Sequence, residues 1–204
     1  MARTPLAAVL IGVAAASLAA CGPTTNSSSS PPPPSSSATA SAAASGAAAT
    51  PDPCQLVTAA EASSLAGTTF GAGREETFSS RGRGCVYTSG SLNVFTVEVA
   101  VAPSAAAAGA GFVEQQTKAQ SALKRFAPTG INLNLTVATV ANLGDRAATV
   151  YGQASLLGQT IGVSGIYVLK GATFFAFQDL EVGHAPPAAA AMEAQARVTL
   201  SRLP

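Results

Sequence analysis

Few side chains in this sequence are of the kinds that catalyse reactions or bind metals. His184 is the only histidine of the 204 residues, and it lies in a Gly-His-Ala-Pro-Pro segment that leads into a predicted helix. We interpret it as a solvated loop residue rather than a member of a triad or a zinc site. The sequence has no Gly-x-Ser-x-Gly elbow, Walker loop or zinc-protease helix motif. It therefore predicts no catalytic residue, no metal ligand and no cofactor.

Charged residues cluster at two places. Asp179 and Glu181 are two apart on a predicted strand and share a face, so they either hold a cation or mark an exposed strand end. The Arg-Gly-Arg-Gly segment at 81–84 is the densest positive stretch and suits anionic glycans or lipid head groups. Glu75 and Glu76 are close enough in sequence to neutralise it, which favours a solvated loop.

Two further groups of residues have a structural and a functional interpretation. Asp145 and Arg146 predict a polar turn, with Asp145 capping a short following helix. Phe174, Phe175 and Phe177 place aromatic rings on both faces of a predicted strand. Core packing is the first explanation for these rings, and one face lining an apolar pocket is the alternative.

The first twenty residues have the pattern of a secretory signal. Arg3 supplies a positive charge, and an apolar run covers 6–18, which is short for a membrane span. The run ends in Leu-Ala-Ala followed by Cys21, which resembles the lipobox of bacterial lipoproteins. This resemblance implies cleavage before Cys21 and lipidation of its thiol, whereas an ordinary signal peptide with a chance cysteine is the alternative. Several buried acyl chains would anchor the protein firmly.

The other two cysteines form an even pair within the folded region. An exported protein with three cysteines has one left over, and lipidation of Cys21 removes it. We expect Cys54 and Cys85 to form a disulfide that closes a loop of about thirty residues, and two free buried thiols are the alternative.

Composition divides the chain into three parts. Residues 1–20 are the predicted signal peptide, and 21–51 are the predicted lipidated cysteine and a disordered Ser/Pro/Ala stalk without charge or large apolar side chains. Residues 52–204 have the composition of one extracytoplasmic domain. The formal charge of +1 falls to zero when Arg3 is removed, which argues against nucleic acid as a partner.

Periodicity and turn residues predict two groups of strands, each followed by a long helix. Thr58 and Glu61 form a capping box for a short helix that ends at Gly67. Hairpins are expected at 84–101 and 160–178, with long helices after Pro103 and Pro186. We predict an α+β fold in which an antiparallel sheet is packed on one face by two long helices, with two β-β-α-like halves and one disulfide.

These features together resemble an actinobacterial cell-envelope lipoprotein family with a domain of unknown function. The resemblance is carried by the lipobox, the Ser/Pro stalk, Asp-Pro-Cys at 52–54, Gly-Cys at 84–85 and Leu-Gly-Asp at 143–145. Many members of this family have Trp beside the second cysteine, where this chain has Tyr87. The resemblance implies a location in the cell envelope and a disulfide, but no activity or catalytic residues.

The sequence thus predicts a lipoprotein on the extracytoplasmic face of the cell membrane, anchored through Cys21. Its most favoured role is a non-enzymatic binding module for a small apolar or envelope-derived ligand, or for a partner protein. The alternatives are a structural or assembly accessory of the envelope and a hydrolase without a recognisable motif.

Overall fold

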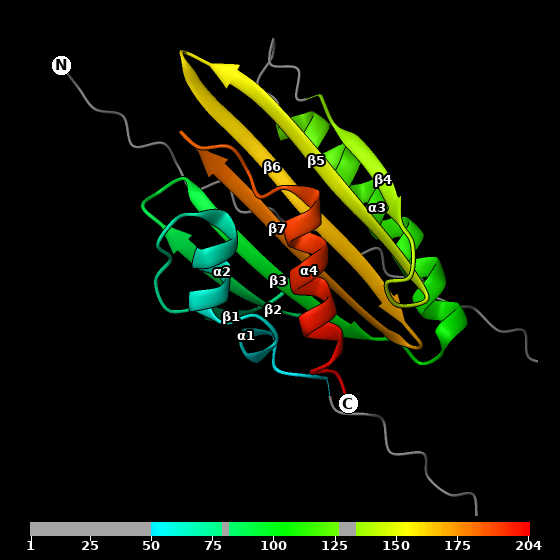
Figure 1. The fold of residues 1–204 in the computed structure, drawn as a ribbon. Coiled ribbons are helices and arrows are strands. Elements are labelled where there is room, and N and C mark those ends of the chain that lie inside the picture. Colours follow the sequence, from blue (N-terminus) through cyan, green and yellow to red (C-terminus); the bar gives the residue numbers. More distant parts are fainter. Residues whose placement is uncertain (1–49, 79–81, 127–133) are drawn as a thin grey trace, which may run out of the picture. The chain divides into compact units, whose positions relative to one another are not determined.

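A single antiparallel sheet of seven strands organises the domain (Figure 1). The computed structural model describes residues 50–78, 82–126 and 134–204. Within them the strands follow the order β1-β2-β3-β7-β6-β5-β4, so β3 of the first strand group pairs with β7 of the second. The strands are β1 (Arg74–Thr77), β2 (Gly82–Ser89), β3 (Asn93–Val101), β4 (Thr136–Val140), β5 (Arg146–Leu156), β6 (Gln159–Lys170) and β7 (Thr173–Val182).

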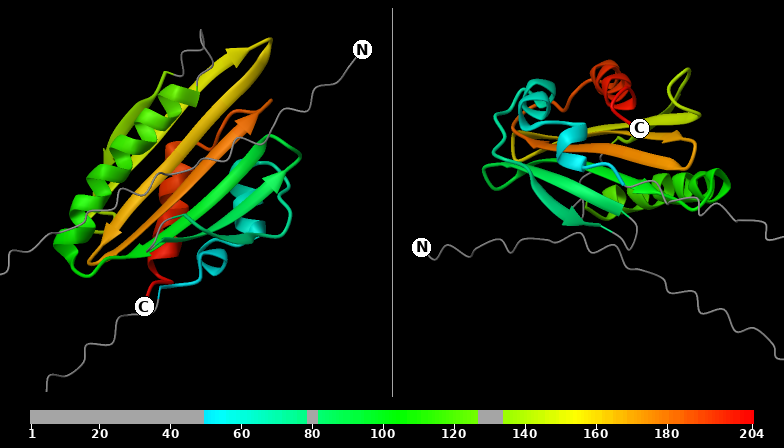
Figure 2. Two further views of the ribbon diagram at one scale, coloured as in Figure 1. Left: turned by 180° about the vertical axis from the view of Figure 1, so that it is seen from behind. Right: turned by 90° about the horizontal axis from the view of Figure 1, so that it is seen from below.

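Helices lie on both faces of this sheet (Figure 2). One face carries α1 (Pro53–Leu56), α2 (Ala59–Ala66) and α4 (Ala189–Leu200), with α1 against β2 and β3 and α4 against β5 and β6. The opposite face carries α3 (Ala105–Phe126), which packs on β6 and β7. None of the helices in the described part of the chain combines the length and apolarity needed to cross a membrane.

The predicted arrangement of two long helices on one face of the sheet is wrong. The domain is mainly a seven-stranded antiparallel sheet, and α3 and α4 lie on opposite faces of it. The reason is visible in β7, where Phe174 points toward α3 while Phe175 and Phe177 join the core under α4. Because both faces of β6 and β7 are apolar, each face needs its own cover.

Both predicted hairpins are present. β2 and β3 pair from Gly82↔Ala100 to Ser89↔Asn93, and β6 and β7 meet at a turn in which Gly171 has a φ of 58°. The strands extend further than the sequence indicated, since β5 reaches Leu156. Residues 68–73, between α2 and β1, form no strand, and the N–H of Phe70 donates to the Ser63 hydroxyl of α2.

The two apolar cores differ in size. The larger lies under α1, α2 and α4, and Phe95 contacts the rings of Phe70, Tyr87 and Phe177 there, with centroids 6.1 to 6.3 Å apart. The smaller core lies under α3, where the ring of Phe112 meets Phe174 edge-on. The buried stripe of α4 consists of Met192, Ala196 and Thr199.

Candidate functional site

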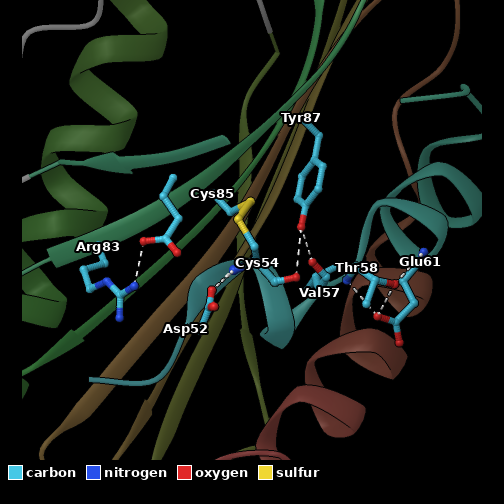
Figure 3. Close-up of a disulfide and its surroundings, with 9 residues drawn as sticks. Asp52, Cys54, Val57, Thr58, Glu61, Arg83, Cys85 and Tyr87 are labelled. Carbon is cyan, nitrogen blue, oxygen red and sulfur yellow. Dashed lines mark hydrogen bonds and ion pairs between the residues drawn. A yellow bond between two sulfur atoms is a disulfide. The ribbon is translucent and has the colours of Figure 1, made fainter. Parts of the chain in front are cut away.

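The predicted disulfide is confirmed and fixes the start of the domain to the sheet (Figure 3). Cys54 on α1 is bonded to Cys85 on β2, and Cys85 is fully buried. Asp52 accepts a hydrogen bond from the backbone N–H of Cys54 at 2.9 Å and so caps α1. The predicted lipidation site, Cys21, lies outside the described residues.

Tyr87 occupies the place beside the second cysteine and supports the same corner. Its hydroxyl donates hydrogen bonds to the carbonyl oxygens of Val57 and Cys54 (Figure 3). The ring is almost completely buried, and this burial raises the pKa of Tyr87 to about 12. Tyr87 is therefore a neutral hydrogen-bond donor that holds the chain between α1 and α2 against β2.

The predicted capping box is also confirmed. Thr58 accepts from the backbone N–H of Glu61, and Glu61 accepts from the backbone N–H of Thr58. Glu61 forms an ion pair with Arg202 as well, and the hydrogen bond from this guanidinium lowers the pKa of Glu61 to about 2. Glu61 therefore links α2 to the C-terminal end of the chain.

The positive segment near the second cysteine is neutralised within its own hairpin. Arg83 forms an ion pair with Glu75 on the neighbouring strand at 2.6 Å, and Arg74 pairs with Glu76. The expected neutralisation by Glu75 is therefore present, but the segment is not a loop, because residues 82–84 belong to strand β2. Arg81 lies outside the described residues. His184 is exposed in the loop between β7 and α4, as expected for a solvated loop histidine.

Asp179 and Glu181 do not mark an exposed strand end. Asp179 is 2% exposed and Glu181 is fully buried, on the face of β7 that carries α1, α2 and α4. Burial, reinforced by the charge of Glu181, raises the pKa of Asp179 to about 8. Within the described residues, no group of three or more His, Cys, Asp or Glu side chains is placed to hold a metal ion.

The clearest pocket is formed by the turn between β4 and β5 together with α3. It has a volume of about 240 Å³ and takes in residues 139–148 together with Phe112 and Gln116 of α3. The sequence did not predict this pocket. Its two sides come from segments about thirty residues apart in the chain, and only the tertiary fold brings them together.

The turn that lines the pocket is held by five contacts. Leu143 is buried in the larger core, and the backbone N–H of Asp145 donates to the carbonyl of Leu169 at 2.7 Å. The Asp145 carboxylate accepts from the N–H of Gly171 at 2.6 Å and pairs with Lys170 at 3.7 Å. The guanidinium of Arg197 on α4 also donates a hydrogen bond to the carbonyl of Asn142.

The predicted role of Asp145 as a helix cap is therefore wrong. No helix follows it, because β5 begins at Arg146, and the carboxylate instead binds the neighbouring β6–β7 turn. Gly144 is required beside it, since its φ is +61° and an added Cβ would lie 2.4 Å from the carbonyl oxygen of Leu169. The Leu-Gly-Asp segment thus has a structural explanation at each position.

This rigid turn directs Arg146 into the pocket. The guanidinium carbon lies 5.1 Å from the centroid of the Phe112 ring, in a cation–π contact. The structure shows no ion pair for Arg146 with any carboxylate in the part of the chain that it describes. The pocket therefore presents an exposed guanidinium, supported on an aromatic ring and without a partner of opposite charge.

Comparisons with protein-family models, curated proteins and solved structures give no match to this chain. Its relation to the actinobacterial lipoprotein family therefore rests on the residues that suggested it. Sequence reasoning identified Arg146 as part of a polar turn but missed its contact with Phe112. The one signal available was the run of turn-forming residues before it, which indicated that the backbone at this point is constrained.

Proposed function

We propose that this chain is an exported lipoprotein, held on the extracytoplasmic face of the cell membrane through lipid on Cys21, and that its domain binds a small ligand without catalysing a reaction. The signal-like residues 1–20 and the lipobox support export and anchoring at the membrane. The disulfide between Cys54 and Cys85 supports an oxidising compartment and accounts for two of the three cysteines, which leaves Cys21 for the anchor.

One observation carries the binding proposal, namely the unpaired guanidinium of Arg146 in the pocket. Arginine recognises carboxylates through two parallel hydrogen bonds, and the Arg146 guanidinium lies over the Phe112 ring at 5.1 Å. The turn is restrained by the core and by α4, so little order has to be gained on binding. These are the features of a preorganised anion-binding group.

The shape of the pocket restricts the ligand class. A volume of about 240 Å³ is small for a ligand site, and suits a compact molecule or the end group of a larger one. The lining combines the apolar side chains of Phe112 and Val140 with the polar groups of Gln116 and Arg146. We therefore propose a ligand in which a carboxylate or similar acid is joined to a small apolar group.

Replacing Cys21 tests the proposed location at the membrane. Cys21→Ala is expected to move the full chain from the membrane fraction to the soluble extracytoplasmic fraction, because the acyl anchor is lost. Thr24→Ala, three residues further on, is the matched control and keeps the protein in the membrane fraction. A Cys21→Ala chain that remains with the membrane through carbonate washing would overturn the proposed anchor.

Titration with benzoate tests the pocket, since this probe joins a carboxylate to a small apolar ring. In ¹⁵N-labelled protein, millimolar benzoate should shift the backbone amide signals of residues 141–148. Arg146→Gln should abolish these shifts, whereas Lys118→Gln on the exposed side of α3 should leave them unchanged. The binding proposal fails if wild type shows no shifts, or if Arg146→Gln shows the same shifts as wild type.

A further inference from the structure

Two buried carboxylates on β7 lack the partners that buried charges need. Asp179 and Glu181 are 2% and 0% exposed, and both side chains point to the face that α1, α2 and α4 cover. Among the described residues, neither oxygen of Asp179 has a hydrogen-bond partner, nor does Oε1 of Glu181. The remaining oxygen of Glu181 accepts only from the hydroxyl of Thr68, at 3.3 Å.

A third unpartnered oxygen comes from the neighbouring strand. Ser164 on β6 is 5% exposed and stands directly opposite Asp179 in the strand register. Facing residues of antiparallel strands have Cβ atoms about 5 Å apart on the same side of the sheet, so Ser164 points into the space that Asp179 borders. Its hydroxyl nevertheless makes no hydrogen bond to that carboxylate or to any other group described.

Among the described residues, no positively charged side chain forms an ion pair with these two carboxylates. Each of the five ion pairs in the described part of the chain lies elsewhere, so no lysine or arginine compensates the two carboxylates. Burial raises the pKa of both groups, and the neighbouring charge of Glu181 adds to the rise at Asp179. His184 opposes this at Glu181 through its charge, but it is exposed and accepts or donates no hydrogen bond there. A positive charge placed between the oxygens would remove the cost of burying them.

We propose that Asp179, Glu181 and Ser164 bind one hard divalent cation of the calcium class, with the Thr68 hydroxyl beside them. Carboxylate and hydroxyl oxygens are ligands of hard cations, and two carboxylates neutralise a charge of 2+. Calcium accepts irregular oxygen sites of variable ligand number, whereas zinc prefers the nitrogen and sulfur ligands that this cluster lacks. This inference is independent of the Arg146 pocket, which is lined by residues 139–148 and by α3 and shares no residue with this cluster.

The cation would join three parts of the chain that are separate in sequence. Ser164 belongs to β6, the two carboxylates belong to β7, and Thr68 lies just after α2. Binding would therefore hold α2 and its following segment onto the sheet. Because sites with few carboxylates bind calcium weakly, we expect a dissociation constant of about 0.1 to 1 mM.

Thermal unfolding of the full chain with and without calcium tests the proposal. The protein is refolded from urea at pH 8 in 10 mM CaCl₂ or in EDTA, so that a buried site can fill during folding. Stabilisation by mass action predicts a melting temperature about 3 to 10 °C higher with calcium. Equilibrium dialysis of the protein refolded in calcium should then show one equivalent of calcium bound.

Two variants separate a site from a general salt effect. Asp179→Asn with Glu181→Gln keeps the side-chain shapes and removes the charges, so it should fold, lose the calcium shift and show no calcium binding. Glu75→Gln with Glu76→Gln removes one exposed and one half-buried carboxylate on β1 instead and should retain the full shift. The proposal is overturned if wild type shows neither a shift nor bound calcium. It is overturned equally if the Asp179→Asn, Glu181→Gln variant responds like wild type.

Discussion

Removing the Cys54–Cys85 disulfide should cost the domain about 4 kcal/mol. The bond closes a loop between residues 31 apart in sequence, and the loop-entropy relation for this length gives about 3.7 kcal/mol at 25 °C. Cys85 is fully buried, so replacing it with alanine also removes a packed sulfur atom from the core. The Cys54→Ala, Cys85→Ala double variant is therefore expected to lose about 4 to 5 kcal/mol of unfolding free energy.

Urea unfolding of the full chain, followed by tyrosine fluorescence and circular dichroism, measures this loss. For a domain of this size, the same change corresponds to a melting temperature lower by about 8 to 20 °C. Tyr87→Phe is the matched control at the same corner, because it keeps the disulfide and removes only the hydrogen bonds to Val57 and Cys54. It should cost about 1 to 3 kcal/mol through the buried carbonyl left without a donor.

The reasoning is refuted if the double variant loses less than about 1.5 kcal/mol. Such a result would mean that the loop is already restrained in the unfolded chain, or that α1 adds little to the stability of the sheet. A larger slope of free energy against urea in the double variant is expected, since an unfolded chain without the bond exposes more surface.

Three further substitutions test individual contacts. Gly144→Ala should destabilise the domain by about 2 kcal/mol or more, because the new Cβ meets the Leu169 carbonyl. Gly90→Ala is the control, since Gly90 has a similar φ but open space around it, and it should cost only about 1 kcal/mol in urea unfolding. Equal losses in the two variants would contradict this explanation. Burial raises the pKa of Glu98, which means that the folded state favours the protonated carboxyl. The stability that this protonated group contributes is present at low pH and is lost as the pH rises through the raised pKa. Glu98→Gln should therefore flatten the decline in stability as the pH rises above the ordinary pKa of a glutamate, and an unchanged slope would argue against it. The pKa of Glu61 is lowered, so the stability from its ion pair with Arg202 is present at neutral pH and is lost as the pH falls from about 4.5 to 2. Glu61→Gln should therefore cost up to about 1 kcal/mol of unfolding free energy at pH 7 and less at pH 2. An equal cost at both pH values would refute the ion-pair explanation.

Local elements of this fold could be predicted from the sequence. The capping box at Thr58 and Glu61 and the turn at Gly171 are short-range signals, and each depends on residues that are neighbours in the chain. The disulfide could be predicted by counting cysteines, once the signal-like residues 1–20 had suggested export. These predictions needed no knowledge of how the strands pair.

The placement of the helices could not be predicted in the same way. Alternating apolar residues show that a strand has a buried face, but they do not show which helix covers it. Phe174 and Phe175 lie on opposite faces of β7, but the predicted fold covered only one face. The assignment of α3 to one face and α4 to the other depends on the connections.

The candidate sites were harder still. One of the two hypotheses for Asp179 and Glu181 placed them at an exposed strand end, because carboxylates are usually solvated. Their burial depends on α4 and on the segment after α2, which the strand pattern does not reveal. Arg146 was placed in a polar turn, but its contact with Phe112 joins segments more than thirty residues apart. A sequence pattern carries no direct sign of such a contact.

The most direct test of the proposed function is a native mass spectrum of the full chain purified from bacterial membranes. We predict a protein that begins at Cys21, carries a diacylglyceryl group and releases a small acidic ligand on denaturation. The same preparation of Arg146→Gln should carry the lipid without the ligand. An unmodified chain that still begins at Met1 would contradict the anchor. A protein without bound ligand, or an Arg146→Gln variant that retains it, would contradict binding at the pocket.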